Sequence, residues 1–391
     1  MATAIQRRRG TTAQHSSFTG IAGEITVDTD KNTVVVHDGS LAGGFPLAHA
    51  DSLGLRNRLM NGDFSVAQRG TTFDSTTTPA NNDDTYLLDR WYVLSDGNDI
   101  VDVTQQSDGA VGDLNYIRLD VETVSKKFGI AQIIERANVK DLIGGSSKVS
   151  LSFNAKVSNA SAGRLDNIKA GIITWSGTAD SVTSDIISAW NAEDTDPTLI
   201  ANATFENTPA NLSVTTSDAR YKIENITIDT ASAANIIVFI WADGLTATLT
   251  DTLEISNVQL EKGSVATDFE HRIDELELSL CKRYYRKIDA DQTYTMFATG
   301  HSNTTTNGRV VVPFSKMRTV PTFSSSGNFR LIQGASAVAV TGLALPVSGA
   351  ETNSENPMIE ATVASGLTAG YACDLTASGD ASAYLAFDAE L

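Results

Sequence analysis

The chain has 391 residues and a mass of 41.5 kDa, which is enough for two or three domains that each bury a hydrophobic core. Its 47 acidic residues outnumber its 29 lysines and arginines, and the net charge of −18 argues against a nucleic-acid-binding protein and against docking on an anionic membrane surface. Two cysteines are too few for a disulfide framework or a cysteine-built metal site. No apolar run is long enough to cross a bilayer or to act as a signal peptide, so we expect neither membrane insertion nor secretion by that route.

The first segment, residues 1–57, predicts a small β module. Between Gly23 and Gly39 the sequence is typical of two strands joined by a turn at residues 30–32, with a second turn at Asp38. So few large apolar side chains accompany these strands that the module cannot hold a stable core alone. Either it rests on the next domain, or other copies of the chain complete it.

Residues 58–270 predict a large β-sandwich or jelly roll. In residues 148–157 every second residue is apolar, which is typical of a half-buried antiparallel strand. Further strands are expected at Tyr221–Ile228, Ile236–Trp241 and Leu253–Leu260. In the last of these the apolar positions shift by one, which indicates a β-bulge. Turn-forming residues separate the strands, and almost no helical pattern intervenes.

An amphipathic linker helix is predicted within residues 271–290. Apolar residues recur at helical spacing from Asp274 to Lys287, with acidic residues in the first turn and basic residues in the last, as the helix dipole favours. Asp274 is expected to cap the helix, with Glu277 completing a capping box. The alternative is that this helix forms a contact between copies of the chain.

Residues 291–391 predict a second, distal β module. From residue 331 onward the chain has no lysine or arginine and seven acidic residues, and small residues dominate. Such a composition forms poor local cores, so we expect this segment to be stabilised by its neighbours or to be partly mobile. The fold class predicted for the whole chain is all-β, with a short N-terminal stem, a large β-sandwich or jelly roll, one linking α-helix and a distal β module.

The N-terminal segment contains a recognisable run of residues: Arg8-Arg-Gly-Thr, His15, Phe18-Thr-Gly20, the stretch Gly23 to Gly39, and Gly43-Gly-Phe-Pro-Leu47. Almost without gaps, this run resembles the head module of bacteriophage tail-fibre and receptor-binding proteins. The resemblance implies an intertwined stem that attaches the fibre to the particle, and hence a homotrimer. It also favours structural hydrogen bonds, rather than metal binding, for His15 and His37.

Two further sets of residues frame the region 58–270. They are Leu59 to Phe73 with Asp89-Arg-Trp-Tyr92, and Val258 to Arg272 with Leu280 to Tyr285. Together they resemble the opening and the ending of a carbohydrate-binding-module-like jelly roll that is common in phage tail proteins. This chain has Ala67 where the family often has tryptophan, which removes one aromatic ring from any sugar platform, and Asp268 where it normally has proline. Residues 314–322 are similar to the start of the distal β module in these proteins.

Motifs for catalysis are missing from the sequence, which has no G-x-S-x-G elbow, no G-x-x-x-x-G-K-[ST] loop and no H-E-x-x-H. With 47 carboxylates, some pair will always fall at the separation that a glycosidase needs, so such a pair carries no evidence by itself. We therefore expect a protein that is not an enzyme.

Glycan binding needs aromatic faces for stacking, with carboxylates, amides and backbone groups beside them for the hydroxyls. Trp190 and Trp175 flank a segment rich in Asp, Ser and Thr, although either ring could instead pack in the core. The glycan-binding candidates are Trp190, Trp175, Tyr92, Asp194 and Asp196, together with the polar run 74–85.

The jelly-roll resemblance also implies a structural calcium ion, held by oxygen ligands near the first and last strands. Asp63 and Glu261 are the matching positions in this sequence. For Asp63 the alternative is a role in a turn.

For function, the resemblance implies a homotrimeric tail fibre or spike of a phage virion. Residues 1–57 would attach it to a tail, baseplate or capsid protein, and the rest would bind a host surface polysaccharide through trimeric avidity. The acidic charge favours a rather uncharged or cation-bridged glycan. Two alternatives stay open: a virion-associated polysaccharide depolymerase or deacetylase, and a head-decorating spike with the same adhesion role.

Overall fold

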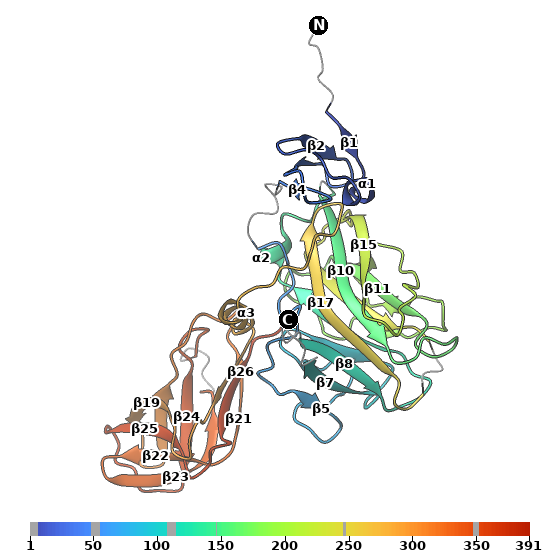
Figure 1. The fold of residues 1–391 in the computed structure, drawn as a ribbon. Coiled ribbons are helices and arrows are strands. Elements are labelled where there is room, and N and C mark those ends of the chain that lie inside the picture. The colour runs from blue at the N-terminus through green and yellow to red at the C-terminus, as the bar shows by residue number, and fades with distance from the viewer. Residues whose placement is uncertain (1–6, 48–54, 108–114, 146, 245–247, 347–351) are drawn as a thin grey trace.

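The computed structural model describes residues 7–47, 55–107, 115–145, 147–244, 248–346 and 352–391. Strands dominate it, and the helices among these residues are short, so the predicted all-β class is confirmed. Figure 1 shows three β regions that follow one another along the chain. Residues 1–6 and 48–54 of the predicted N-terminal module lie outside the described residues. No helix in the described part is long and apolar enough to span a membrane.

The N-terminal region is a small sheet with the strand order β1-β2-β3-β4. Its elements are β1 (Arg9–Gly10), α1 (Thr12–Ser16), β2 (Ile25–Asp28), β3 (Thr33–Val36) and β4 (Phe45–Pro46). The predicted hairpin is β2–β3, and its turn contains Asn32 at a φ of 48°. His15 and His37 each place Nε2 against the hydroxyl of Thr26, at 2.8 and 2.9 Å, so both rings make buried structural hydrogen bonds.

A two-sheet sandwich follows. The six-stranded sheet consists of β15 (Ala219–Thr227), β10 (Lys148–Val157), β17 (Thr252–Lys262), β8 (Asn115–Val121), β7 (Val101–Ser107) and β5 (Thr72–Phe73), in this order. The five-stranded sheet consists of β14 (Ala203–Phe205), β11 (Ile168–Trp175), β16 (Asn235–Ala242), β9 (Phe128–Ile134) and β6 (Tyr92–Ser95). Smaller elements are α2 (Arg136–Val139), β12 (Ile187–Ala189) and β13 (Thr198–Leu199).

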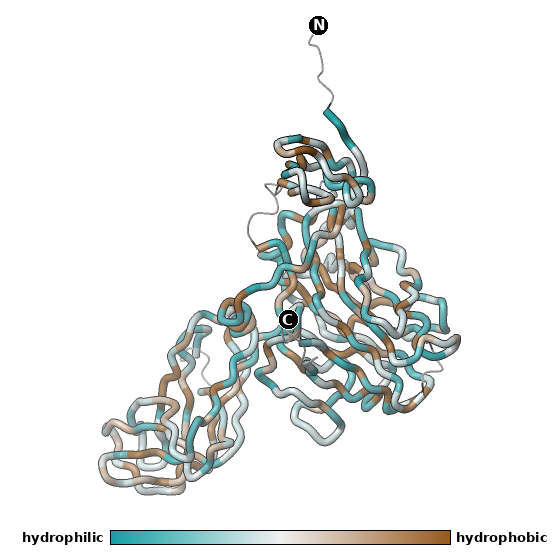
Figure 2. Tube along the Cα trace, in the orientation of Figure 1, coloured by the Kyte–Doolittle hydropathy of each residue, from teal (hydrophilic) through white to brown (hydrophobic). Residues whose placement is uncertain are grey.

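The sandwich core forms where the apolar faces of both sheets meet. β10 contributes the alternating residues that the sequence predicted, all of them buried: Val149, Leu151, Phe153, Ala155 and Val157. The predicted bulge in β17 is confirmed, because Ser152 pairs with Gln259 whereas Asn154 pairs with Ser256. Figure 2 shows hydrophobic and hydrophilic residues alternating along many of the strands, as a half-buried sheet requires. The five-stranded sheet differs, because β9 and β16 are buried at every position and a second apolar cluster covers its other face.

The linking helix is shorter than predicted. α3 spans Asp274–Cys281, and the chain then enters strand β18 (Tyr285–Asp289), which pairs along its length with β26 (Tyr384–Asp388). This tertiary pairing overrides the local helical pattern, so the predicted helix over 271–290 is wrong in its second half. The predicted capping box is also wrong, because Asp274 lies inside the helix and Ile273 is its N-cap without a side-chain hydrogen bond.

The distal region contains a closed barrel with the strand order β19-β20-β24-β23-β22-β25 and a three-stranded sheet with the order β18-β26-β21. The barrel strands are Met296–Ser302, Asn307–Val311, Met358–Val363, Ser336–Ala344, Phe329–Gln333 and Ala372–Ala377, and β21 is Thr322–Ser326. Leu331, Ile359, Leu375 and Phe387 are fully buried in one core with residues of β19 and β20. The small-residue segment from 331 onward is therefore stabilised by neighbouring strands, as one of its two predicted states requires.

Candidate functional site

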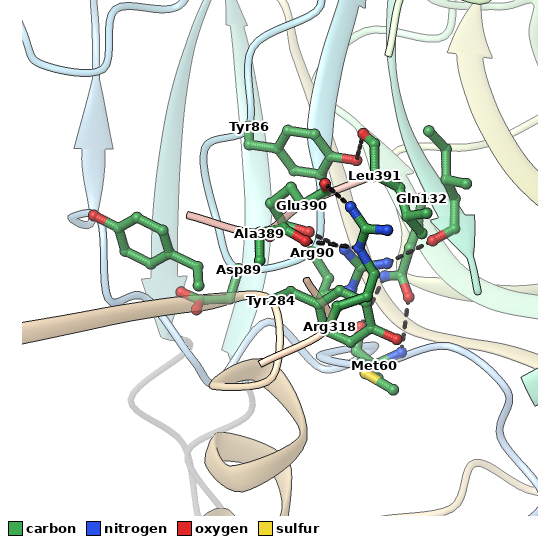
Figure 3. A network of polar contacts seen from close by, with 12 residues as sticks. Met60, Tyr86, Asp89, Arg90, Gln132, Tyr284, Arg318, Ala389, Glu390 and Leu391 are labelled. Carbon is green, nitrogen blue, oxygen red and sulfur yellow. Dashed lines mark hydrogen bonds and ion pairs between the residues drawn. The ribbon is translucent and has the colours of Figure 1, made fainter. Parts of the chain in front are cut away.

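Several residues of the motifs that frame the sandwich, among them Arg90 and Tyr284, meet where the sandwich joins the distal region (Figure 3). Arg90 is buried, and its guanidinium pairs with the carboxylate of Glu390. It also donates to the carbonyl of Ile133 at 2.5 Å and stacks over the ring of Tyr284, 3.7 Å from the ring centre. A buried arginine needs a charged partner of this kind, because an uncompensated charge in the interior is costly, although Nε of Arg90 has no hydrogen-bond partner.

A second arginine repeats this arrangement beside the first. Arg69 pairs with Asp388 at 3.0 Å and with Glu390 at 3.4 Å, and it lies 3.6 Å from the ring centre of Tyr285. Both arginines therefore lie in the sandwich and bind carboxylates from the end of the distal region. We call this set of contacts, from Arg69, Arg90, Tyr284, Tyr285, Asp388 and Glu390, the junction.

Backbone contacts close the junction further. Arg318 donates to the carbonyls of Ala389 and Glu390 at 2.7 and 2.6 Å, and the hydroxyl of Tyr86 donates to a carbonyl of Leu391 at 3.1 Å. These side chains point toward one another in Figure 3. Arg69, Arg90 and Glu390 are buried, whereas the side chain of Asp388 is 40% exposed. The junction is therefore a structural connection and not a ligand site.

A hollow that is open to solvent lies elsewhere, beside α3. Its volume is about 750 Å³, and its walls include Asp63, Gln68, Asn115, His271 and Glu275. A smaller hollow of about 150 Å³ shares Asn115 with it and lies over the six-stranded sheet. We call the two together the polar groove.

The floor of the smaller hollow follows from the alternation of the strands. In β8 the residues Ile117 and Leu119 point into the core, so Tyr116 and Arg118 point outward. Arg118 pairs with Glu254 of β17 at 2.8 Å, and Lys156 of β10 pairs with the same carboxylate at 2.9 Å.

Hydrogen-bonding groups surround the partly exposed ring of Tyr116 on this floor. Lys156 Nζ lies 5.7 Å from the centre of the ring, and Asn154 donates to Asp218 at 2.8 Å. An aromatic face beside amides and carboxylates is the combination that binds polyhydroxylated ligands. Sequence reasoning missed Tyr116, although the period-two pattern of residues 115–121 was the signal that placed it on the outer face.

The two tryptophans predicted as sugar platforms pack against the other sheet. Trp190 lies 6.0 Å from Phe239, which stacks on Trp241 at 4.6 Å between ring centres. Trp175 belongs to the same apolar cluster, and its indole N–H donates to the carbonyl of Thr178 at 2.9 Å. Both rings are partly buried, as the core alternative for them anticipated.

Asp194 and Asp196 lie close together and anchor the turn that follows Trp190. Asp196 accepts from Lys169 at 3.1 Å, and Lys169 also pairs with the fully buried Asp243 at 3.1 Å. The backbone N–H of Asp194 donates to Asp243 at 2.8 Å. Burial would raise the pKa of Asp243, but hydrogen bonds from two lysines, Lys127 and Lys169, hold that pKa below its usual value.

Tyr92 does not have the environment expected for a glycan contact. Tyr92 is only 1% exposed, so its ring offers no face to a ligand and the prediction of a glycan contact there is wrong. Its backbone belongs to β6, the edge strand of the five-stranded sheet, and its ring is buried in the apolar cluster on the other face of that sheet, 5.0 Å from the ring of Tyr86.

Asp63 and Glu261, the two positions predicted to hold a calcium ion, each accept hydrogen bonds from the protein. Glu261 is buried and accepts from the backbone N–H and the hydroxyl of Thr267, both at 2.7 Å. Asp63 accepts from Ser65 at 2.9 Å in a turn and borders the larger hollow. Within the described ranges, no three His, Cys, Asp or Glu side chains group closely enough to hold a metal ion.

Known proteins resemble the N-terminal region of this chain most clearly. Residues 5–41 match the Major tropism determinant N-terminal domain. Over 51 residues the chain is 76% identical to the tail fiber receptor-binding protein of Bordetella phage BPP-1. This confirms the resemblance to phage tail-fibre and receptor-binding proteins for the N-terminal module. The match covers 13% of this chain and 13% of that relative.

Several solved structures are similar to parts of this chain. The Major Tropism Determinant U1 variant is 39% identical and covers 26% of this chain and 20% of its own, with a TM-score of 0.13. The enzymatically active domain of bacteriophage CBA120 tailspike protein 4 is 15% identical over 53% of this chain and 21% of its own, with a TM-score of 0.31. A putative sugar binding protein from Bacteroides thetaiotaomicron VPI-5482 is 16% identical over 53% of this chain and 100% of its own, also at 0.31.

Proposed function

We propose that this chain is a non-catalytic adhesion protein of a bacteriophage particle, a tail fibre or surface spike that binds a glycan of the host cell surface. The observation that carries the proposal is the N-terminal module, which is 76% identical over 51 residues to a phage tail fiber receptor-binding protein. This similarity supports attachment to a tail, baseplate or capsid protein through residues 1–57, with the sandwich and the distal region left to meet the host. Labelling particles with an antibody to this chain would distinguish a tail location from a head location.

A homotrimer fits the surface of the N-terminal module. Its large apolar side chains Ile21, Phe45 and Leu47 are 76%, 52% and 55% exposed, although the module has only short strands with which to bury them. Apolar groups gathered on so small a unit favour contact with other copies. Light scattering should give a mass near three times 41.5 kDa. A clean monomer would contradict the trimer.

The polar groove is the part of the sandwich that best fits a glycan. Its volume of about 750 Å³ beside α3 and its extension over Tyr116 offer one aromatic face and several carboxylates and amides to sugar hydroxyls. Stacking of a sugar on an aromatic ring contributes through buried apolar area, and the polar groups around the ring fix the orientation of the ligand. The groove is acidic, which favours a neutral or cation-bridged glycan over a polyanionic one.

Binding to host cells tests the groove. Purified chain carrying Tyr116→Ala should bind at least tenfold more weakly than the parent, because the stacking face is lost, while its unfolding midpoint should stay within a few degrees. Tyr371→Ala is the matched control, since Tyr371 is a 63% exposed tyrosine of the distal region. If only Tyr371→Ala lost binding, the receptor site would have to lie on the distal barrel and not in the polar groove. Release of reducing ends or acetate from host polysaccharide would contradict the non-catalytic reading and favour a depolymerase or deacetylase.

A further inference from the structure

One corner of the six-stranded sheet gathers negative charge without any ion pair. Asp102 of β7 lies directly opposite Asp120 of β8 in the strand register. Like charges opposite one another across two strands destabilise a sheet. Asp74, Asp99 and Glu122 lie near enough to act electrostatically on Asp102. Among the described residues, the ion pairs of lysine and arginine include none of these five carboxylates, although the chain forms many such pairs elsewhere.

A buried amide side chain points into this corner and is not fully satisfied. Asn81 is fully buried, and its Nδ2 lies 3.1 Å from Asp99 Oδ1, 2.9 Å from the carbonyl of Val101 and 3.1 Å from Asp102 Oδ1. An amide nitrogen has two N–H bonds, so one of these three oxygens lacks a donor from it. The other amide atom, Asn81 Oδ1, is buried with no hydrogen-bond partner. A buried acceptor without a partner calls for an unseen donor, water or ion.

The oxygens of the corner match the ligands of a hard cation. Two carboxylates and one backbone carbonyl converge on Asn81 Nδ2, and a half turn of the Asn81 amide would direct Oδ1 toward these three oxygens. Four oxygens facing one another repel unless a cation lies between them. A mixed, irregular oxygen set of this kind suits calcium better than magnesium, which demands near-octahedral geometry and keeps its waters.

We propose that this corner binds one calcium ion per chain, with Asp99, Asp102, the Val101 carbonyl and the Asn81 side chain as protein ligands. The ion ties the loop of residues 74–85 to β7 and neutralises the Asp102–Asp120 pair. Neither Asp63 nor Glu261 takes part in it. The site differs from the polar groove and does not depend on a glycan-binding role.

Calorimetric titration of the full chain with calcium chloride, after removal of metal by EGTA, tests the proposal. We expect one ion per chain with a dissociation constant on the order of 10⁻⁴ M, and a clear preference for calcium over magnesium. The double variant Asp99→Asn/Asp102→Asn should lose at least tenfold in affinity. The matched control is Asp229→Asn, at an exposed aspartate elsewhere in the sandwich, which should bind calcium as the parent does.

Thermal unfolding separates metal binding from damage to the fold. In EGTA the double variant should unfold at the same or a higher temperature than the parent, because it removes repulsion between carboxylates. With calcium in excess the parent should gain several degrees and the double variant should not. No calcium binding by the parent, or equal binding by the double variant, would overturn the proposal.

Discussion

The junction and the polar groove are both polar, but they are built in opposite ways. At the junction both arginines are buried and share the buried carboxylate of Glu390, and each has an aromatic ring against its guanidinium. In the groove the side chains lie on the outer face of a sheet and keep part of their surface in water. The sequence resemblance reached the residues of the junction, whereas Tyr116 and its neighbours belong to no recognised motif. In this chain the recognisable residues include those that connect the sandwich to the distal region. The exposed surface around Tyr116, which could contact a ligand, belongs to no recognised motif.

Replacing Arg90 should have the largest effect, because it tests whether the buried charges of the junction stabilise the fold. Replacing it by methionine leaves the carboxylate of Glu390 buried with only Arg69 as a charged partner. Breaking one partner out of a buried ion pair typically costs about 3–5 kcal/mol, so Arg90→Met should lower the free energy of unfolding by about that amount. Urea denaturation measures this change. Binding to host cells at a temperature where the variant is folded should be unaffected.

A surface ion pair provides the control for this prediction. Lys126 and Asp96 are 3.1 Å apart with side chains 38% and 39% exposed, so Lys126→Ala should cost less than about 1 kcal/mol. If Arg90→Met and Lys126→Ala lowered the free energy of unfolding by the same amount, the buried ion pairs of the junction would contribute no more than an exposed ion pair. Adding Glu390→Gln to Arg90→Met should recover part of the loss, because the second change removes the unpaired charge.

A substitution at Trp190 tests whether the aromatic rings that pack on the five-stranded sheet stabilise the fold or bind a ligand. The ring packs on Phe239 and is partly buried, so Trp190→Ala should destabilise the chain by about 2–3 kcal/mol, less than a fully buried tryptophan would. Glycan binding should not change. A folded variant that keeps its stability and loses binding would instead make Trp190 part of the receptor site, as its sequence context suggested.

The sequence predicted the fold well where one periodic signal acted alone. The alternation in residues 148–157 and the phase shift in β17 depend only on which face of a strand is buried, so both appear in the structure as predicted. The end of α3 at Cys281 could not be predicted, because the segment that follows forms β18 and pairs with a strand about a hundred residues further along. Long-range pairing leaves no trace in a local pattern.

The candidate site was harder to predict than the fold, for a related reason. Tyr92 and Trp190 were attractive because they are aromatic, but composition cannot say whether a ring faces a core or the solvent. Asp194 and Asp196 are separated by one residue in the sequence, yet their role follows from Lys169 and Asp243, which the fold brings to them. Asp63, which the jelly-roll resemblance marked as a calcium ligand, borders the larger hollow of the groove.

The smallest predicted effect concerns the rim of the junction and is visible only as a pH dependence. Burial would raise the pKa of Glu135, but hydrogen bonds from Arg283 at 2.7 Å and from the hydroxyl of Tyr284 at 2.8 Å hold it below its usual value. A carboxylate whose pKa is lowered on folding stabilises the folded state above its unfolded pKa, about 4.3 for glutamate, and loses that contribution as the pH falls through the folded value. Glu135→Gln should therefore cost about 1 kcal/mol at neutral pH, and this difference from the parent should shrink steadily below about pH 4. Glu355→Gln, at an exposed glutamate of the distal region, should show no difference at any pH. A difference for Glu135→Gln that stays constant down to pH 3 would mean that packing, rather than charge, holds this rim together.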